Sequence, residues 1–327
     1  MSGAVSASIE SEDLPPSLWD GGILYLPAHL AAAHKSRLVA MSMLDAYLAE
    51  PDKPHAVGGD SAEAATEHFV WRFLNSAARA EYVCADPVGV NRPAKNLLLE
   101  QLTDGAVQVL DIAAGHGAGT LAILSFIGAM REESKLPKLP LNVSIRALDF
   151  SAEALVHYQE VAASLGTWLA EQGINLSVEA SHVDMRMQGE VSQALDTYFD
   201  DARASGCKRF LCVLSAISGV GPQAMSEMQA SFQEIASRIG NQPGGSWVWI
   251  EPPVSGKWLQ TFITGIFYTL KKIKNKLMLI GGTFDLSAPT SPFPGFSSPA
   301  STFKWRDPHT LSDLLSHVRV LSASVEE

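Results

Sequence analysis

The sequence of 327 residues predicts an α/β fold: a doubly wound, mostly parallel sheet with helices on both faces, preceded by a helical extension. Three observations predict it. From residue 107 onward, short apolar runs alternate with stretches of helical periodicity, as in strands joined by crossover helices. Over residues 21–100 the periodic stretches are helical, and a Pro/Gly loop at residues 52–60 separates the first from the second. Hydrophobic residues make up 46% of the chain, enough for one large core.

The N-terminal part is expected to be a tail followed by a helical cap. Residues 1–20 are small, polar and acidic, and predict a loosely attached tail. They have neither the basic start nor the apolar run of a secretory signal. Apolar residues at helical spacing predict helices over residues 28–50, 61–82 and 93–102, so residues 21–100 form the cap.

Residues 101–327 are expected to form the α/β domain. Apolar and alternating runs predict strands over residues 107–112, 142–149, 174–180, 209–214 and 246–251. Helical periodicity predicts helices over residues 120–133, 152–171, 190–204 and 223–239. The aromatic-rich segment near residues 256–301 predicts a cap insertion. Residues 308–317 have a helical pattern, and residues 318–325 are expected to form a sixth strand.

Charge and composition exclude several classes of function. The net charge of −11 disfavours a nucleic-acid partner, because phosphates are held by many Lys and Arg contacts. A basic cluster at residues 271–276 is the exception, and a solvated helix face is the alternative interpretation. No run of about 18 uncharged apolar residues occurs, so no stable membrane insertion is expected.

Cysteine and histidine spacing predict no metal site. Cys84, Cys207 and Cys212 lack metal-ligand spacing. Cys207 and Cys212 lie on or beside an apolar run and are expected to be reduced core residues, which indicates a cytoplasmic protein. His29 and His34 lie five residues apart on one predicted helix, which is not the i, i+4 spacing of a helical metal pair.

The most informative segment is the glycine-rich turn that follows the strand at residues 107–112. Asp111 ends this strand, and Ala113, Gly115 and Gly117 follow before the next helix. Glycines let the backbone approach a ligand, and the helix N-terminus presents free N–H groups. An acid beside this turn disfavours a phosphate and favours a ligand that carries a positive charge. A phosphate-binding loop would also need a Gly-Lys-Ser/Thr run, which is absent.

This segment resembles motif I of class I S-adenosylmethionine-dependent methyltransferases, Asp/Glu-x-Gly-x-Gly-x-Gly. Asp111, Gly115 and Gly117 match the motif, and Ala113 replaces its first glycine. The resemblance implies a seven-stranded type of sheet and S-adenosylmethionine as cofactor. It also implies that Asp149, with Phe150 beside it at the end of the second strand, binds the ribose hydroxyls. The alternatives are a dinucleotide site for the glycine turn, and an ordinary helix N-cap for Asp149.

Three further residues follow from the same resemblance. Asp184 and Met185, after the third strand, are expected to contact the adenine. Ser215, after the fourth strand, is expected to line the pocket near the methyl group. Without the resemblance, Asp184 is equally well explained as a solvated loop acid, and His116 as a residue of the pocket wall.

The expected function is methyl transfer to a small-molecule acceptor, at oxygen or nitrogen. No catalytic base can be identified; Glu251, at the end of the fifth strand, is the candidate on the acceptor side, and a salt-bridge partner is the alternative. The competing hypotheses are an RNA or protein methyltransferase, a non-catalytic subunit that acts with a partner, and a dehydrogenase. A homodimer or a partner subunit is compatible with each of them.

The C-terminus is the least regular part of the prediction. The family adds an antiparallel seventh strand beside the fifth, and the expected sixth strand already reaches residue 325. Residues 277–286 or 301–306 are therefore expected to fill this position, unless the chain is truncated or a partner supplies the strand.

Overall fold

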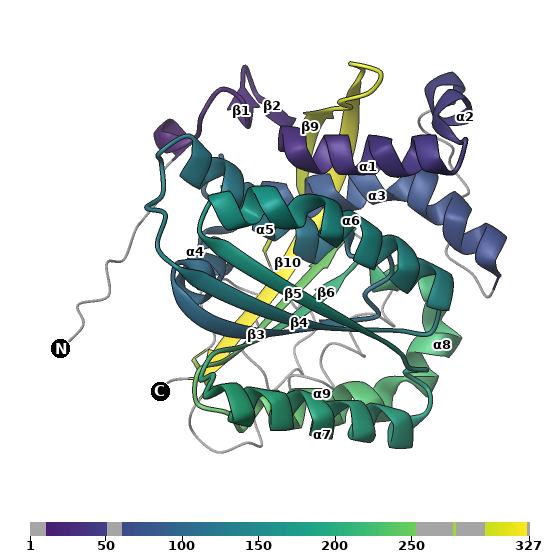
Figure 1. Cartoon of the computed structure of the whole chain (residues 1–327), viewed down its shortest axis with the longest axis vertical. Coiled ribbons are helices and arrows are strands. Elements are labelled where there is room, and N and C mark those ends of the chain that lie inside the picture. The colour runs from purple at the N-terminus through teal and green to yellow at the C-terminus, as the bar shows by residue number, and fades with distance from the viewer. Residues whose placement is uncertain (1–10, 51–60, 253–276, 279–297, 326–327) are drawn as a thin grey trace, which may run out of the picture.

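One sheet organises the molecule, and its central strands are parallel (Figure 1). The computed structural model describes residues 11–50, 61–252, 277–278 and 298–325. Among these residues the strand order is β1-β2-β9-β10-β7-β6-β3-β4-β5, and β8 pairs with β10.

The helices and strands have the following bounds. The helices are α1 (Ala28–Ala40), α2 (Leu44–Ala49), α3 (Ala62–Ala85), α4 (Arg92–Leu102), α5 (Ala118–Glu132), α6 (Ala152–Glu171), α7 (Gln188–Ser205), α8 (Gly221–Glu227) and α9 (Gln229–Gly240). The strands are β1 (Trp19–Asp20), β2 (Ile23–Tyr25), β3 (Gly105–Ile112), β4 (Leu141–Asp149), β5 (Ile174–His182), β6 (Phe210–Ser215), β7 (Gly245–Glu251), β8 (Leu277–Met278), β9 (Ser301–Arg306) and β10 (Asp313–Val325). Short 3-10 helices cover Ser11–Asp13 and Ile217–Val220.

Helices cover both faces of the sheet, as the sequence predicts. In Figure 1, α1, α3, α5 and α6 lie above the sheet, and α7 and α9 lie below it. Each face has its own core. The larger core joins the sheet to α1 and α3–α6, and the smaller one joins it to α7–α9. Strand β3 contributes to both cores, because its side chains point alternately to the two faces of the sheet. Val107 and Val109 lie in the larger core, and Leu110 and Ile112 lie in the smaller one.

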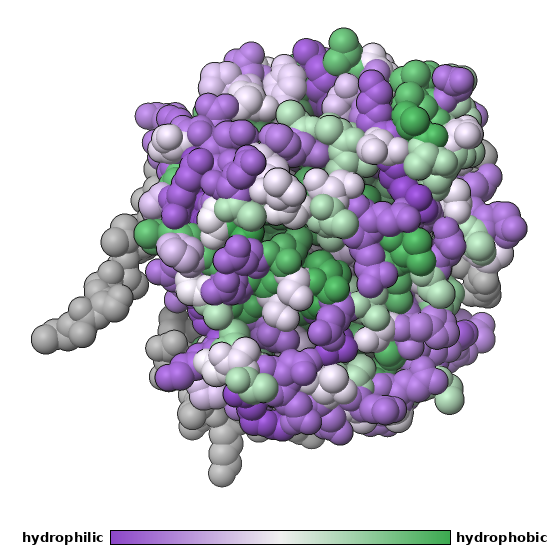
Figure 2. All heavy atoms as spheres, viewed as in Figure 1, coloured by the Kyte–Doolittle hydropathy of each residue, from purple (hydrophilic) through white to green (hydrophobic). Residues whose placement is uncertain are grey.

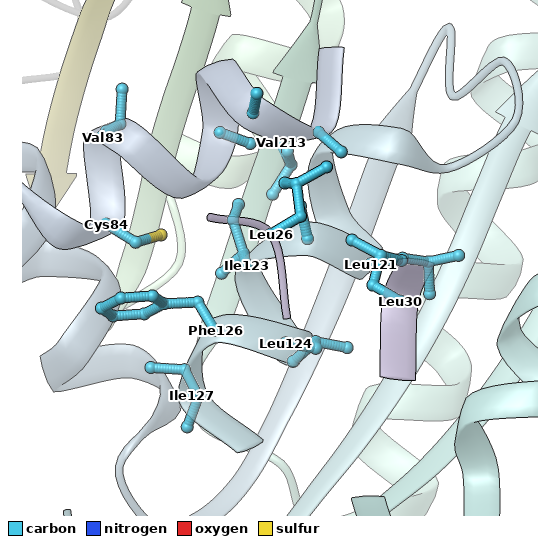
Figure 3. Packing of buried hydrophobic residues seen from close by; sticks show 14 of the residues in the cluster. Leu26, Leu30, Val83, Cys84, Leu121, Ile123, Leu124, Phe126, Ile127 and Val213 are labelled. Carbon is cyan, nitrogen blue, oxygen red and sulfur yellow. The ribbon is translucent and has the colours of Figure 1, made fainter. Parts of the chain in front are cut away.

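The larger core is built mainly on the contact between α3 and α5. Figure 3 shows Val83 and Cys84 of α3 near Ile123, Phe126 and Ile127 of α5. All of these side chains are at most 2% exposed. Thus α3, which belongs to the predicted cap, is part of the main core and holds α5 in place.

Burial along the strands follows their position in the sheet. Strands β6 and β7 are central and buried along nearly their whole length, as in parallel sheets covered on both faces. Strand β5 is at the edge, and its exposed Asn175, Ser177 and Glu179 alternate with half-buried apolar residues. Figure 2, viewed from the same side as Figure 1, shows apolar side chains gathered near the middle of the molecular surface and polar side chains around them.

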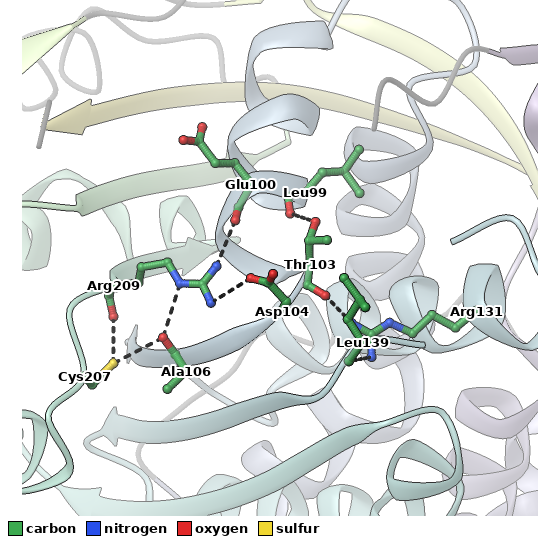
Figure 4. A network of polar contacts seen from close by, with 9 residues as sticks. All are labelled: Leu99, Glu100, Thr103, Asp104, Ala106, Arg131, Leu139, Cys207 and Arg209. Atoms are coloured by element: carbon green, nitrogen blue, oxygen red, sulfur yellow. Dashed lines mark hydrogen bonds and ion pairs between the residues drawn. The ribbon is translucent and has the colours of Figure 1, made fainter. Parts of the chain in front are cut away.

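Two arginines tie together the amino edge of the sheet (Figure 4). The Arg131 guanidinium donates to the carbonyl oxygens of Leu139 at 2.8 Å, Gln172 at 2.9 Å and Thr103 at 2.6 Å. Arg209 donates to the carbonyl oxygen of Glu100 at 3.1 Å. The loops at this edge are therefore fixed by polar contacts, and the opposite, carboxyl edge is left to form a site.

The N-terminal part is more ordered and less purely helical than expected. Leu14 and Leu18 are buried in the larger core, so the predicted loose tail does not extend to residue 20. Strand β2 pairs in parallel with β9 and so adds the segment to the sheet. The single helix predicted over residues 28–50 is two helices, because Ser42 between them has a φ of 58°.

At the C-terminus, the predicted helix over residues 308–317 is wrong. Strand β10 (Asp313–Val325) runs antiparallel to β7, with Val320 opposite Ile250, and so fills the position that residues 277–286 or 301–306 were expected to fill. Strand β9 lies on its other side. Residues 318–325 therefore belong to the inserted strand, not to a sixth parallel one, and residues 301–306 are its neighbour. Apart from these ends and residues 277–278, the predicted insertion near 256–301 lies outside the described residues.

No helix in the part of the chain that the structure describes is both long and apolar enough to cross a membrane.

A buried acid in the larger core gives a first prediction: Glu81→Met is expected to stabilise the fold by about 1–2 kcal/mol at pH 8. Glu81 is 0% exposed, and neither carboxyl oxygen has a hydrogen-bond partner among the described residues. Burial raises its pKa well above the ordinary value, so stability is lost as the pH rises. Urea unfolding should show a larger gain at pH 8 than at pH 5. A loss of stability at both pH values would contradict this.

Candidate active site

The turn between β3 and α5 has three residues in the left-handed backbone region. Ala113, Gly115 and Gly117 have φ values of 47°, 53° and 75°. Glycine adopts this conformation at little cost, whereas alanine loses about 1 kcal/mol there. Ala113 therefore keeps the backbone shape that its position requires, although it replaces a glycine of the motif. Gly117 is the N-cap residue of α5, so this turn brings the N–H groups of the helix to the carboxyl edge of the sheet.

Asp149, at the end of β4, is held against this turn. One carboxylate oxygen accepts a hydrogen bond from the Gly115 N–H at 2.8 Å, and the other accepts one from the Ser151 N–H at 2.8 Å. The N-cap of α6 is Ser151, whose hydroxyl accepts from the Ala154 N–H at 3.2 Å. The capping role that was the alternative for Asp149 is thus taken by Ser151. Burial raises the pKa of Asp149, and the two N–H groups oppose this effect.

Asp111, at the end of β3, is buried below the turn and is 2% exposed. The Tyr158 hydroxyl, from α6, donates to one of its carboxylate oxygens at 2.9 Å. Burial raises the pKa of Asp111 to about 7, against the lowering effect of the Thr120 and Tyr158 hydroxyls. The structure therefore brings two acids to the same turn, each contacted by hydrogen-bond donors, and Phe150 lies half-buried beside the second.

The side chains of Asp184 and Met185, after β5, have partners within the protein. The Asp184 carboxylate is engaged by Arg186, whose Nη2 lies 2.7 Å from it, and this contact lowers the pKa of Asp184. Met185 is 3% exposed and packs in the smaller core, between the sheet and α7–α9. Both residues follow the carboxyl end of β5, but their side chains contact parts of the protein other than the glycine turn.

The ends of β6 and β7 are held together by Glu251. One carboxylate oxygen of Glu251 accepts from the Ile217 N–H at 2.7 Å and from the Trp249 indole N–H at 2.7 Å. Glu251 is 4% exposed and thus shapes the turn after β6. Ser215, before this turn, is close to α5, since a Cβ on Gly119 would lie 2.6 Å from the Ser215 Cβ.

Sequence reasoning missed a histidine cluster that joins the cap to the glycine turn. We use this name for His34, His68, His116 and His157; three of them contact Phe69, and His68 contacts His116 with ring centroids 5.4 Å apart. The ring centroid of Phe69 lies 5.1 Å from that of His34, 5.4 Å from that of His116 and 4.7 Å from that of His157. His116 therefore contacts side chains of α3 and α6. Burial lowers the pKa of all four histidines. Their sequence spacing gave no signal, because they come from four separate segments.

A small surface hollow lies between α2, α3 and the hairpin of β9 and β10. Its lining includes Tyr47, Trp71 and Trp305, and none of the predicted site residues. In the described part of the chain, no group of three or more His, Cys, Asp or Glu residues could hold a metal ion.

Comparison with known proteins gives little. No protein-family model matches the chain, and no curated protein does. Among solved structures, a protein from the conversion of a disulfide bond into a thioacetal group in echinomycin biosynthesis matches at 12% identity and a TM-score of 0.32, over 70% of this chain and 79% of that one.

Two further solved structures are described as methyltransferases. A protein of Pyrococcus horikoshii assigned as an RNA methyltransferase matches at 11% identity and a TM-score of 0.33, over 77% and 84% of the two chains. A glycopeptide N-methyltransferase in complex with sinefungin matches at 13% identity and a TM-score of 0.24, over 70% and 81%. Such weak likeness leaves the chemistry of the site to be inferred from its own residues.

Proposed function

We propose that this chain is an S-adenosylmethionine-dependent methyltransferase that acts on a small-molecule acceptor. The observation that carries the proposal is the arrangement of Asp149: a buried carboxylate at the end of the second parallel strand, fixed by the N–H groups of Gly115 and Ser151. A carboxylate has about four lone-pair sites, so two remain for the two hydroxyls of a ribose. Because the N–H bonds fix the carboxylate beforehand, little order is lost on binding.

The second acid suits the charge of the methyl donor. Asp111 is buried with hydroxyl donors, and it forms no ion pair among the described residues. A ligand with a cationic group near Asp111 would lower its pKa and favour the carboxylate. A dinucleotide phosphate would instead be repelled by this acid, which argues against the dehydrogenase hypothesis.

In methyl transfer from S-adenosylmethionine, the main task of the protein is to align the donor with the acceptor. When bound, the methyl donor supplies a sulfonium that is already activated for an in-line displacement. The residues at the carboxyl edge would bind and orient it, and alignment of the two reactants alone can supply about 7–11 kcal/mol. Glu251 would act indirectly, because its carboxylate already accepts two hydrogen bonds that fix the turn after Ser215.

The choice of a small-molecule acceptor rests on the charge. A net charge of −11 opposes binding of a polyanion. The basic cluster at residues 271–276, which favoured an RNA or protein acceptor, lies outside the described residues. One reason for the non-catalytic hypothesis is removed, because β10 fills the antiparallel position beside β7.

The test is calorimetric titration with S-adenosylmethionine and S-adenosylhomocysteine. The wild type is expected to bind both in the micromolar range, and Asp149→Ala should weaken binding about 5- to 30-fold, the equivalent of about 1–2 kcal/mol. Mass spectrometry of acceptor mixtures would then identify the methylated product.

A matched control is Asp86→Ala. Asp86 is a buried acid, 3% exposed, that accepts from the Asn91 N–H at 2.7 Å, but it lies after α3, away from the glycine turn. The Asp86→Ala variant should be less stable than the wild type but should bind S-adenosylmethionine with the same affinity. Absence of binding by folded wild-type protein would refute the cofactor assignment, and turnover with RNA alone would refute the acceptor class.

A further inference from the structure

A buried tyrosine lies directly beneath the glycine turn. Tyr158 of α6 is 0% exposed, and its hydroxyl donates to Asp111 at 2.9 Å. Its ring packs against the turn itself, since a Cβ on Gly117 would lie 2.5 Å from two ring atoms of Tyr158. One side chain thus contacts both the acid and the turn that follows it.

The groups that face Asp111 come from four elements. They are Tyr158 of α6, Asp149 of β4, Cys212 of β6 and Thr120 of α5. None of these is a cation. In such a setting an ionised carboxylate depends on hydrogen-bond donors, and the Tyr158 hydroxyl is the one in good geometry.

We propose that Tyr158 is a positioning residue: its hydroxyl orients the Asp111 carboxylate and keeps it ionised, so that Asp111 can receive the cationic amino group of the methyl donor. This inference rests on the proposed function, and it concerns the same site. The helix that carries Tyr158 begins at Ser151, whose N–H binds Asp149, so α6 fixes both acids at once.

The cap supports the same helix. Arg37 of α1 donates to the ring of His157 at 2.9 Å and forms an ion pair with Glu160 at 2.6 Å. These contacts hold α6 on either side of Tyr158. The cap is therefore placed to keep the tyrosine hydroxyl at its distance from Asp111.

The experiment is a titration with S-adenosylhomocysteine, which keeps the amino group, at intervals from pH 6 to pH 8.5. For the wild type, affinity should rise as Asp111 ionises near pH 7. In Tyr158→Phe the carboxylate loses a donor, so the same rise should occur about one pH unit higher. Titration of the ligand itself is common to both proteins and does not affect this difference.

The matched control is Tyr198→Phe. Tyr198 is equally buried, and its hydroxyl donates to the Gln108 carbonyl oxygen of the same strand at 2.9 Å, but from the other face of the sheet. It should leave the pH profile in place. A profile for Tyr158→Phe that falls uniformly at all pH values, or that matches Tyr198→Phe, would overturn the inference.

A second readout needs no ligand. The unfolding free energy of the wild type, relative to Asp111→Asn, should fall as the pH rises through about 7, because the folded-state pKa of Asp111 is raised. In the Tyr158→Phe background this fall should extend to higher pH; an unchanged curve would refute the link between the two side chains. Failure of the wild type to bind any donor, with this link intact, would count against the proposed function alone.

Discussion

Acidification from pH 7 to pH 4 is expected to unfold the protein cooperatively, because the histidine cluster must take up protons that the folded state cannot accommodate. His34 and His157 are 0% exposed, and His116 is 5% exposed. His34 stacks on Phe73 and His157 stacks on Phe69, whereas His116 meets His157 edge-on. Glu153 lies 3.5 Å from Nε2 of His157 at the margin of the cluster. Charging His34 or His116 would place a cation in an apolar interface between the cap and the glycine turn.

The sign follows from the direction of the pKa shifts. Burial lowers the pKa of His34 to about 3, and those of His68 and His157 to about 4. The unfolded chain therefore binds more protons than the folded one below pH 6.5, and stability falls as the pH falls towards 4. His34 alone could contribute up to about 4 kcal/mol, a large share of the 5–15 kcal/mol typical of a folded protein. Asp111 and Glu81 oppose this, since their raised pKa values favour the folded state in acid.

Urea unfolding at several pH values between 4 and 8 measures the effect. His34→Phe should reduce the difference in proton uptake between the unfolded and folded states by close to one proton, because a neutral ring replaces a fully buried histidine. Phe73→Leu is the matched control: Phe73 stacks on His34 at 5.3 Å but carries no proton, so it should lower stability equally at each pH. Equal slopes for the wild type and His34→Phe would contradict the prediction.

The fold was largely predictable where strands and helices alternate. Helix α6 has the predicted bounds, and the predicted strand over residues 142–149 differs from β4 by one residue. The C-terminus was not predictable, because Leu311, Leu314 and Leu315 have helical spacing and yet the chain pairs with β9 as a strand. There, pairing within the sheet overrides the local pattern.

The candidate site divides in the same way. The structure brings Asp111, Gly115 and Asp149 together, since they follow neighbouring strands of a parallel sheet. Tyr158 and the histidine cluster had no sequence signal, because their roles depend on how α3 and α6 pack over the turn. Asp184 also illustrates the limit: its partner Arg186 is two residues away, a local contact that strand order does not reveal.

Gly117→Ala is expected to destabilise the fold by about 2–4 kcal/mol and to abolish detectable donor binding. Gly117 has a φ of 75°, where an L side chain loses about 1 kcal/mol. The new methyl group would also lie 2.5 Å from the ring of Tyr158, and relief of such an overlap costs about 1–3 kcal/mol. Because Tyr158 is fully buried, its ring can move only by shifting α6, and this would pull its hydroxyl away from Asp111.

Gly115→Ala separates the two effects in the same turn. Gly115 also has a positive φ, 53°, but a Cβ there would meet no atom within 4 Å. It should therefore cost about 1 kcal/mol of stability, from the backbone alone. Thermal and urea unfolding of both variants, and of Gly117→Ala combined with Tyr158→Leu, measure the difference. The excess cost of Gly117→Ala should shrink when Leu replaces the ring, because the overlap is then relieved. Equal destabilisation by Gly115→Ala and Gly117→Ala would show that the Tyr158 ring does not constrain the turn, and that the turn can accommodate a methyl group at residue 117 despite the short distance.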